Sequence, residues 1–407
     1  MRAITVKVGL ASCGIAAGAD AVYRRLESYL IESSKMVQLK RTGCIGMCFE
    51  EPIVEFDGGD LGRVTLGKVE PKQIIHLLEE YLSDRMPKTN LILADQHDAK
   101  HNPLMASQMR IVLKNCGVID PQSIEEYEET GGYQALKQAL SMRPYAVIDL
   151  VKASGLRGRG GAGFPTGLKW DFAFEQPGPK KYVICNADEG DPGAFMDRSL
   201  LEGDPHRIIE GMLIGAYAMG ADEGYIYCRA EYPLAIKHLK IAIQAATEKN
   251  YLGANIMGTD FSFTLHIKEG AGAFVCGEET ALMHSIEGMR GMPTLRPPYP
   301  AESGLWGKPT NINNVETWAN VPWIILNGPQ AFRAIGTQQS PGTKVFALAG
   351  KVVGSGLIEV PMGISIRDII YKVGGGIKNG KEFKAIQLGG PSGGCIPADL
   401  LDTKVDY

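Results

Sequence analysis

Residues 155–170 read GLRGRGGAGFPTGLKW, and the organisation of the chain is best understood from this stretch outward. Six of its sixteen residues are glycine, which lets a backbone approach a ligand closely but weakens helices and strands. Such a density is typical of loops whose backbone N–H groups bind phosphate. Arg157, Arg159 and Lys169 supply matching positive charge. The stretch therefore predicts a phosphate-binding loop, with a mobile surface loop as the alternative.

The chain of 407 residues is long enough for about two to four domains. Its apolar content of 44% and charged content of 22% are ordinary for a soluble globular protein. A net charge of −4 does not indicate a polyanionic partner, and no apolar run approaches the ~18–20 residues of a membrane span. We therefore expect a cytoplasmic protein that binds no nucleic acid and does not insert into a membrane.

The glycine-rich loop contains the pattern G-x-G-x-x-G at Gly158, Gly160 and Gly163. In the standard dinucleotide fingerprint a strand precedes these glycines and a helix follows them. Here a helix is predicted over 144–154, before the loop, and a Phe-Pro pair follows the last glycine. We therefore reject the standard dinucleotide interpretation. The Walker pattern of P-loop ATPases is also absent from the sequence.

A second candidate site begins where a predicted strand over 181–185 ends. The residues that follow include Asn186, Asp188, Glu189 and Asp191. Open α/β sheets bind ligands at the carboxyl ends of their strands. Amide and carboxylate acceptors favour a hydroxyl-rich ligand there, and the alternatives are a solvated turn or a divalent metal site.

Two later stretches have a similar character. Residues 270–277 predict a glycine turn that opens a helix, with Glu278 and Glu279 at the positive N-terminus of that helix. Residues 309–317 predict the start of another helix with amide side chains facing outward.

The eight cysteines are sparse for a disulfide scaffold in a chain of this length, so some are expected to serve metal binding or packing. Three lie within residues 1–85, at Cys13, Cys44 and Cys48, and the last two form a C-x3-C pattern shortly before Glu51. This region resembles thioredoxin-like [2Fe–2S] ferredoxin domains, which have one cysteine pair in each of two loops. The second pair matches. The first is incomplete, because no second cysteine follows Cys13 at the expected spacing.

Because a [2Fe–2S] cluster normally has four ligands, two interpretations of the three cysteines remain open. Either a group other than cysteine completes the site, or the cluster has been lost and the N-terminal unit is a docking domain.

Four long stretches occur in fixed order: GLRGRGGAGFPTGLKW at 155–170, CNADEGDPGAF at 185–195, GAGAFVCGEETAL at 270–282 and RPPYPAESGLWGKPTNINNVET at 296–317. Together they resemble the FMN-bearing, NADH-oxidising subunit of respiratory complex I and its relatives in NAD-linked hydrogenases, formate dehydrogenases and bifurcating enzymes. The resemblance covers residues 108–407. The stretch SCGIAAGA at 12–19 is most similar to the β subunit of electron-bifurcating [FeFe]-hydrogenases.

The resemblance implies two bound cofactors and assigns residues to each. FMN would be bound by Gly158, Arg159, Gly160, Lys169, Asn186, Asp188, Glu189, Phe274, Gly277, Glu278, Asn313 and Asn314. NADH would contact Phe164, Phe172, Asp191, Glu279, Arg296 and Tyr299. The family more often has Glu at position 191. The chemistry belongs to the cofactor, so no side chain is assigned a catalytic acid or base role.

The resemblance also implies a multidomain α/β fold. We expect a thioredoxin-like ferredoxin domain over 1–85, a linker over 86–107, a Rossmann-like FMN and NADH domain over 108–339, and a ubiquitin-like β-grasp (SLBB-like) module over 340–407. A [4Fe–4S] site is expected only in an extension beyond residue 407, since no C-x-x-C pattern occurs in the chain.

The implied partners are a small thioredoxin-like [2Fe–2S] subunit and an iron–sulfur or hydrogenase subunit. The leading hypothesis is an NADH-oxidising or NAD-reducing subunit of a soluble bifurcating hydrogenase. The alternatives are the equivalent subunit of a formate dehydrogenase, transhydrogenase or complex I, a quinone-reducing membrane-arm partner, or a degenerate nucleotide-binding scaffold. The sequence leaves open the terminal donor or acceptor and the direction of electron flow.

Overall fold

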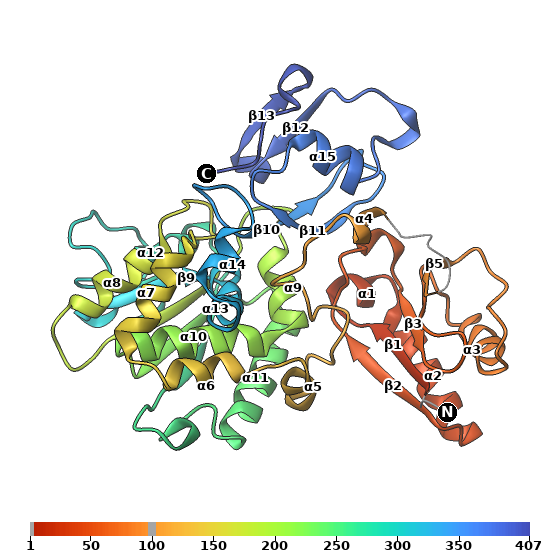
Figure 1. Ribbon diagram of the computed structural model, residues 1–407, viewed down its shortest axis with the longest axis horizontal. Helices are drawn as coiled ribbons and strands as arrows, with labels where there is room; N and C mark the ends of the chain where they lie inside the picture. The colour runs from red at the N-terminus through yellow and green to blue at the C-terminus, as the bar shows by residue number, and fades with distance from the viewer. Residues whose placement is uncertain (1–3, 97–102) are drawn as a thin grey trace.

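The first part of the chain folds into a mixed five-stranded sheet (Figure 1). The computed structural model describes residues 4–96 and 103–407. The strand order is β2-β1-β3-β4-β5; β1 and β2 are parallel, and the other neighbours are antiparallel. The strands are β1 (Ile4–Gly9), β2 (Val37–Thr42), β3 (Val54–Asp57), β4 (Val64–Leu66) and β5 (Ile92–Asp95).

Two helices, α2 (Ala19–Ser33) and α3 (Ile74–Leu82), pack side by side against this sheet. Leu26 of α2 and Leu78 of α3 share a buried cluster with Phe56 of β3, as expected for helices with one apolar face. A short helix, α1 (Ser12–Ala16), follows β1.

Part of the predicted linker over 86–107 is ordered structure. Its residues Ile92–Asp95 form β5, which pairs with β4 so that Ala94 lies opposite Thr65. A short helix, α4 (Pro103–Ala106), follows, and residues 97–102 lie outside the described part of the chain. The prediction was wrong for β5 because a four-residue edge strand depends on backbone hydrogen bonds from a distant neighbour, which local composition does not reveal.

The central region is built on a parallel four-stranded sheet with the order β8-β7-β6-β9. Cys185 of β6 lies opposite Ile226 of β7 and Asn313 of β9. Both faces of the sheet are covered: Val183 and Cys185 face the larger core, and Ile184 faces a smaller one. The strands are β6 (Tyr182–Ala187), β7 (Glu223–Arg229), β8 (Thr264–Gly270) and β9 (Thr310–Asn314).

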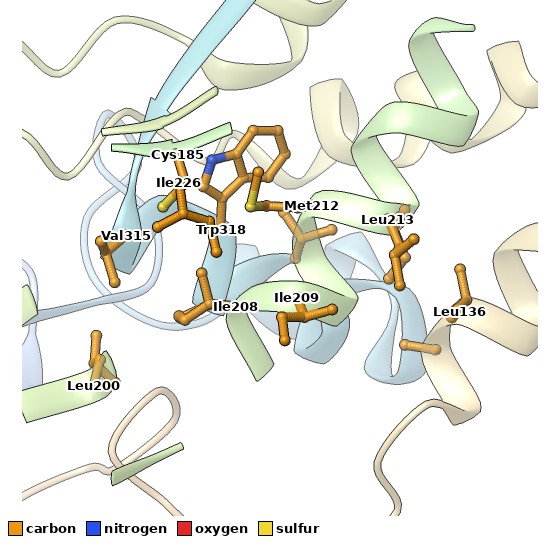
Figure 2. Close-up of a cluster of buried hydrophobic side chains, with 14 of the residues drawn as sticks. Leu136, Cys185, Leu200, Ile208, Ile209, Met212, Leu213, Ile226, Val315 and Trp318 are labelled. Atoms are coloured by element: carbon orange, nitrogen blue, oxygen red, sulfur yellow. The ribbon is translucent and has the colours of Figure 1, made fainter. Parts of the chain in front are cut away.

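Helix α10 forms the centre of the larger core, where Ile208 and Met212 pack near Trp318 of α13 (Figure 2). Gly211 permits this close approach, because a Cβ there would lie 2.2 Å from the carbonyl oxygen of Trp318. The helices of this region are α5 (Ile124–Glu129), α6 (Gln134–Leu140), α7 (Pro144–Ser154), α8 (Thr166–Glu175), α9 (Met196–Gly203), α10 (Pro205–Met219), α11 (Pro233–Glu248), α12 (Glu279–Ile286), α13 (Val315–Asn327) and α14 (Pro329–Arg333).

The stretch 309–317 differs from its prediction. Residues Thr310–Asn314 form the edge strand β9, and the helix begins only at Val315. The amides do not face outward: Asn311 and Asn313 are buried. The asparagine-rich composition concealed a strand whose polar side chains find hydrogen-bond partners inside the protein.

The C-terminal region contains two antiparallel strand pairs, β10 with β11 and β12 with β13. Within the described residues these pairs belong to separate two-stranded sheets, so the single β-grasp sheet stays a prediction. The elements are β10 (Thr343–Leu348), β11 (Gly356–Pro361), α15 (Ile366–Asp368), β12 (Ala385–Leu388) and β13 (Gly394–Pro397). Across the described chain, no helix is long and apolar enough to span a membrane.

The three regions are in contact with one another. Met47 and Ile53 of the N-terminal unit share a buried cluster with Ile358 and Val360 of β11. The N-terminal unit also contacts α9, where Ser12 donates hydrogen bonds from its N–H (2.9 Å) and its hydroxyl (2.5 Å) to the buried carboxylate of Glu202.

Candidate functional site

The glycine-rich loop connects α7 to α8 at the edge of the central sheet. Helix α7 ends at Gly155, whose φ of 69° is the left-handed conformation common after helices. The loop then folds back on itself, with the Gly158 N–H donating to the Phe164 carbonyl at 2.8 Å. At its tip, a Cβ on Gly160 would lie 3.2 Å from the Cβ of Asn314, at the end of β9. The sequence therefore places glycine where the loop approaches β9 closely.

The two cations predicted for this site have different roles in the structure. The buried guanidinium of Arg159 donates to the carbonyl oxygens of Arg157 (3.0 Å), Pro341 (2.7 Å) and Thr343 (3.0 Å), so it joins the loop to the C-terminal region. Lys169, on the first turn of α8, forms a partly exposed ion pair with Glu279. Of the two, Lys169 is the cation with exposed surface available to a phosphate.

The acidic loop after β6 contains a carboxylate with an unsatisfied oxygen. Asp188 is 8% exposed, and its Oδ2 has no hydrogen-bond partner in the described part of the protein. Burial raises its pKa to about 6, although Arg229 opposes this shift. Asn186 connects the loop to the second glycine turn by donating to the Gly277 carbonyl at 2.9 Å. A Cβ on Gly277 would lie 3.3 Å from the Asp188 carbonyl oxygen. An unpaired, buried acceptor of this kind requires a donor, which a ligand hydroxyl would supply.

Two of the predicted acidic residues cap helices. Glu189 accepts from the N–H groups of Asp197 and Arg198, both at 3.1 Å, at the start of α9. Glu278 accepts from the N–H groups of Thr280 (2.9 Å) and Ala281 (3.0 Å) at the start of α12. Both carboxylates thus fix the helices that surround the site.

The predicted amides lie at the ends of the strands, beside the glycine loop. Asn313 Oδ1 accepts from the buried indole N–H of Trp170 at 3.0 Å. Asn314 caps α13 and donates to Asp197 at 2.6 Å. Sequence reasoning missed Asp197 as part of this cluster. Burial and the neighbouring Glu189 raise the pKa of this residue well above its usual value.

Aromatic side chains with exposed surface lie in the same segments. Phe274 is 62% exposed and Tyr299 is 55% exposed, and Phe164 and Phe172 are also exposed. A Cβ at Gly190 would lie 2.9 Å from the Phe274 ring, so the acidic loop and the second glycine turn meet. Exposed rings of this kind suit stacking of a planar ligand.

The remaining residues predicted to contact NADH are engaged with the protein. Arg296 pairs with Glu278 (2.9 Å) and Glu279 (3.5 Å). Asp191 accepts from the hydroxyl of Ser392 at 2.8 Å, so it contacts the C-terminal region rather than lying free. Sequence reasoning missed this contact, which joins residues 201 positions apart.

A second candidate site lies in the N-terminal unit. The sulfur atoms of Cys13, Cys44 and Cys48 lie within 4.8 Å of one another. Glu51 is buried beside them, and its burial raises its pKa to about 7. Thiolate-rich sets of this kind suit iron–sulfur clusters and zinc. Sequence reasoning missed Glu51 as a member of the site; an acidic residue closely following a C-x3-C loop was the available signal.

A helix–glycine loop–helix next to the carboxyl ends of parallel strands defines an α/β protein that binds a phosphorylated, hydroxyl-rich cofactor. Residues 151–323 match the family described as the Nuo51 FMN-binding domain. The chain is 60% identical over 300 residues to the NADP-reducing hydrogenase subunit HndC of Solidesulfovibrio fructosivorans, covering 74% of this chain and 61% of that one. It is 50% identical over 299 residues to an NADH-quinone oxidoreductase subunit of Aquifex aeolicus, covering 74% and 70%. The chain belongs to this family of FMN-binding subunits.

A solved structure supports the same relationship. A crystal structure of an NAD+-reducing [NiFe]-hydrogenase in the H2-reduced state matches with a TM-score of 0.64 at 31% identity, covering 99% of this chain and 66% of that chain. The chain thus spans about two thirds of the length of these relatives.

Proposed function

We propose that this chain is the flavoprotein subunit through which a multi-subunit redox complex exchanges electrons with NAD(H). Family membership and the 60% identity to a hydrogenase subunit support this proposal. The partners would be a small thioredoxin-like [2Fe–2S] subunit and an iron–sulfur or hydrogenase subunit, in the cytoplasm. The stretch at 12–19 extends the proposal to an electron-bifurcating hydrogenase.

The observation that best supports FMN as the cofactor is the unpaired oxygen of Asp188. This buried acceptor lies between the acidic loop and the glycine turn at Gly277, within reach of the residues that join them. A ribityl chain carries several hydroxyl donors, so it fits a site that presents an unsatisfied carboxylate oxygen. The backbone of the loop at 158–163 and the exposed cation Lys169 would bind the phosphate.

When bound, FMN supplies the chemistry of accepting a hydride and releasing single electrons. The work of the chain is to hold two planar rings in register and to exclude water. Phe164, Phe172 and Tyr299 offer ring faces for the nicotinamide and adenine. Glu279, positioned by Lys169 and Arg296, offers an acceptor for the ribose or amide of NADH.

Helix α9 places the N-terminal unit near this site. Its first N–H groups bind Glu189 of the acidic loop, and near its other end Glu202 binds Ser12, the neighbour of Cys13. The helix has eight residues, which corresponds to about 12 Å at ~1.5 Å per residue. This short connection supports the proposal that the N-terminal domain carries a redox centre that serves the flavin.

The flavin content of Asp188→Ala tests the FMN assignment. The variant should lose FMN on dialysis, while the wild type retains it, because a hydrogen bond to a charged group contributes about 1.5–3 kcal/mol. Asp222→Asn is the control, since Asp222 is an exposed carboxylate paired with Lys180 at 3.0 Å. Full flavin in Asp188→Ala would contradict the site. A wild-type protein that binds no flavin would contradict the function and favour the degenerate scaffold.

A further inference from the structure

The three thiols of the N-terminal unit meet because of the topology of its sheet. Strands β1 and β2 are parallel neighbours, so the segments that follow them leave the same edge. Cys13 follows β1 in helix α1, and Cys44 follows β2. Cys48 lies one turn further, with its sulfur 3.6 Å from that of Cys44. The fold therefore brings three thiolate ligands together from segments 31 to 35 residues apart, by subtraction of 13 from 44 and 48.

Glu51 turns inward at this site. It is 8% exposed, and the Cys13 thiol lies 3.7 Å from its Oε1. Its Oε2 accepts from the Ile53 N–H at 2.8 Å, which fixes the orientation of the carboxylate. Two glycines leave it room: a Cβ would lie 3.3 Å from both oxygens at Gly9 and 3.2 Å from Oε2 at Gly14.

The carboxylate of Glu51 has no counter-charge from the protein. Within residues 4–96 and 103–407, no lysine, arginine or histidine pairs with it, and its hydrogen-bond partners are one thiol and one backbone N–H. Buried charges in proteins are paired or coordinate metals, because leaving water is costly for an isolated ion. A cationic centre among the neighbouring thiolates would supply the missing partner.

We propose that Glu51 is the fourth protein ligand of a metal centre formed with Cys13, Cys44 and Cys48. The four ligand atoms form two close pairs, the sulfurs of Cys44 and Cys48 at 3.6 Å and the Cys13 sulfur with Glu51 Oε1 at 3.7 Å. Two ligands for each of two irons is the arrangement of a [2Fe–2S] cluster. The same four groups would also suit one tetrahedral Zn²⁺. The assignment concerns the N-terminal unit, and it holds whether or not the flavin site is correct.

The test compares metal binding by the 407-residue chain and its variants in two arms. One arm is anaerobic reconstitution with Fe²⁺ and sulfide, read by iron and sulfide analysis and by EPR after dithionite reduction. The other arm is titration with Zn²⁺ alone against a chelator. We expect Glu51→Gln to lower metal affinity at least about tenfold in the arm where the wild type binds, the scale of loss seen when groups around a metal site are changed.

Two further variants guard against misfolding and non-specific effects. Glu51→Cys should retain the metal and, in the iron arm, shift the EPR g-values, because a thiolate replaces a carboxylate. Glu50→Gln, at the adjacent position where Glu50 pairs with Lys68 at 3.3 Å, should match the wild type. Wild-type affinity in Glu51→Gln, an unshifted spectrum in an iron-loaded Glu51→Cys, or no metal in either arm would overturn the proposal. Binding in the zinc arm alone that depends on Glu51 would support the ligand set with a single ion.

Discussion

At the scale of single residues, Asp188 combines a cost to folding with a use in binding. Burial raises its pKa from 3.8 to about 6. Because the folded-state pKa is the higher one, the folded state binds more protons between about pH 4 and pH 6. Stability from this group is therefore present at low pH and is lost as the pH rises through that window. The flavin-free protein should carry this penalty in full near pH 8.

We expect Asp188→Asn to remove the penalty while weakening flavin binding. The flavin-free variant should be more stable than the wild type at pH 8, by up to about 3 kcal/mol for a shift of about two pKa units. The difference should be smaller at pH 5. Urea unfolding of both flavin-free proteins at the two pH values measures this. An equal difference at both values would show that the carboxylate does not titrate as proposed.

Glu279 should favour NADH over NADPH. A carboxylate near the ribose accepts from its free hydroxyls and repels a 2′-phosphate. Lys169 and Arg296 hold Glu279 in place, and Arg296 also brings positive charge that a phosphate could use. We therefore expect Glu279→Gln to narrow the preference, measured as the ratio of kcat/KM for the two nucleotides with ferricyanide as acceptor. A wild-type ratio near one would contradict this role.

At the scale of elements, the stability of α9 depends on Glu189. Its carboxylate accepts from two N–H groups that the helix itself cannot satisfy, those of Asp197 and Arg198. Glu189→Ala should destabilise the protein by about 1–2 kcal/mol, the usual value of a lost helix cap. Glu189→Gln keeps one acceptor oxygen and should cost less. Denaturant unfolding measures the series, and equal stability of the Ala variant and the wild type would contradict the capping role.

The elements that sequence reasoning predicted well are those determined by local chemistry. The helix predicted over 144–154 is α7, with Pro144 at its start and Gly155 after its end. The predicted capping box is also present, because the Ser123 hydroxyl accepts from the Glu126 N–H at 3.2 Å. Both signals act within a few residues of the chain, so the sequence alone carries them.

The elements and site residues that were missed depend on distant partners. Strand β9 requires β6 beside it and the Trp170 indole to satisfy Asn313, 143 positions away. Glu51 becomes a candidate ligand only because parallel pairing of β1 and β2 brings the cysteine loops together. In the same way, Arg159 was predicted from its charge to bind phosphate, but the carbonyls it contacts come from positions 341 and 343.

At the scale of the whole molecule, the two candidate sites lie at opposite ends of α9. Lys40 of the N-terminal unit also pairs with Glu126 at 2.8 Å, and the Leu357 N–H donates to the Gly46 carbonyl at 2.9 Å. The cysteine loop at 44–48 is thus held by both of the other regions. This arrangement gives the N-terminal unit a fixed position relative to the flavin site, as single-electron transfer between two centres requires.

The distribution of cysteines predicts how far electrons travel within these residues. Outside the N-terminal site, Cys116, Cys185, Cys228 and Cys276 are buried and Cys395 is exposed, in separate elements. A [4Fe–4S] cluster normally needs four cysteines together. We therefore expect residues 1–407, expressed alone, to bind FMN and to oxidise NADH with ferricyanide, but to hold no [4Fe–4S] cluster. Iron analysis and EPR of the dithionite-reduced protein measure this. A [4Fe–4S] signal would contradict the prediction, whereas its absence would mean that transfer to the physiological acceptor requires a partner or a cysteine-rich extension.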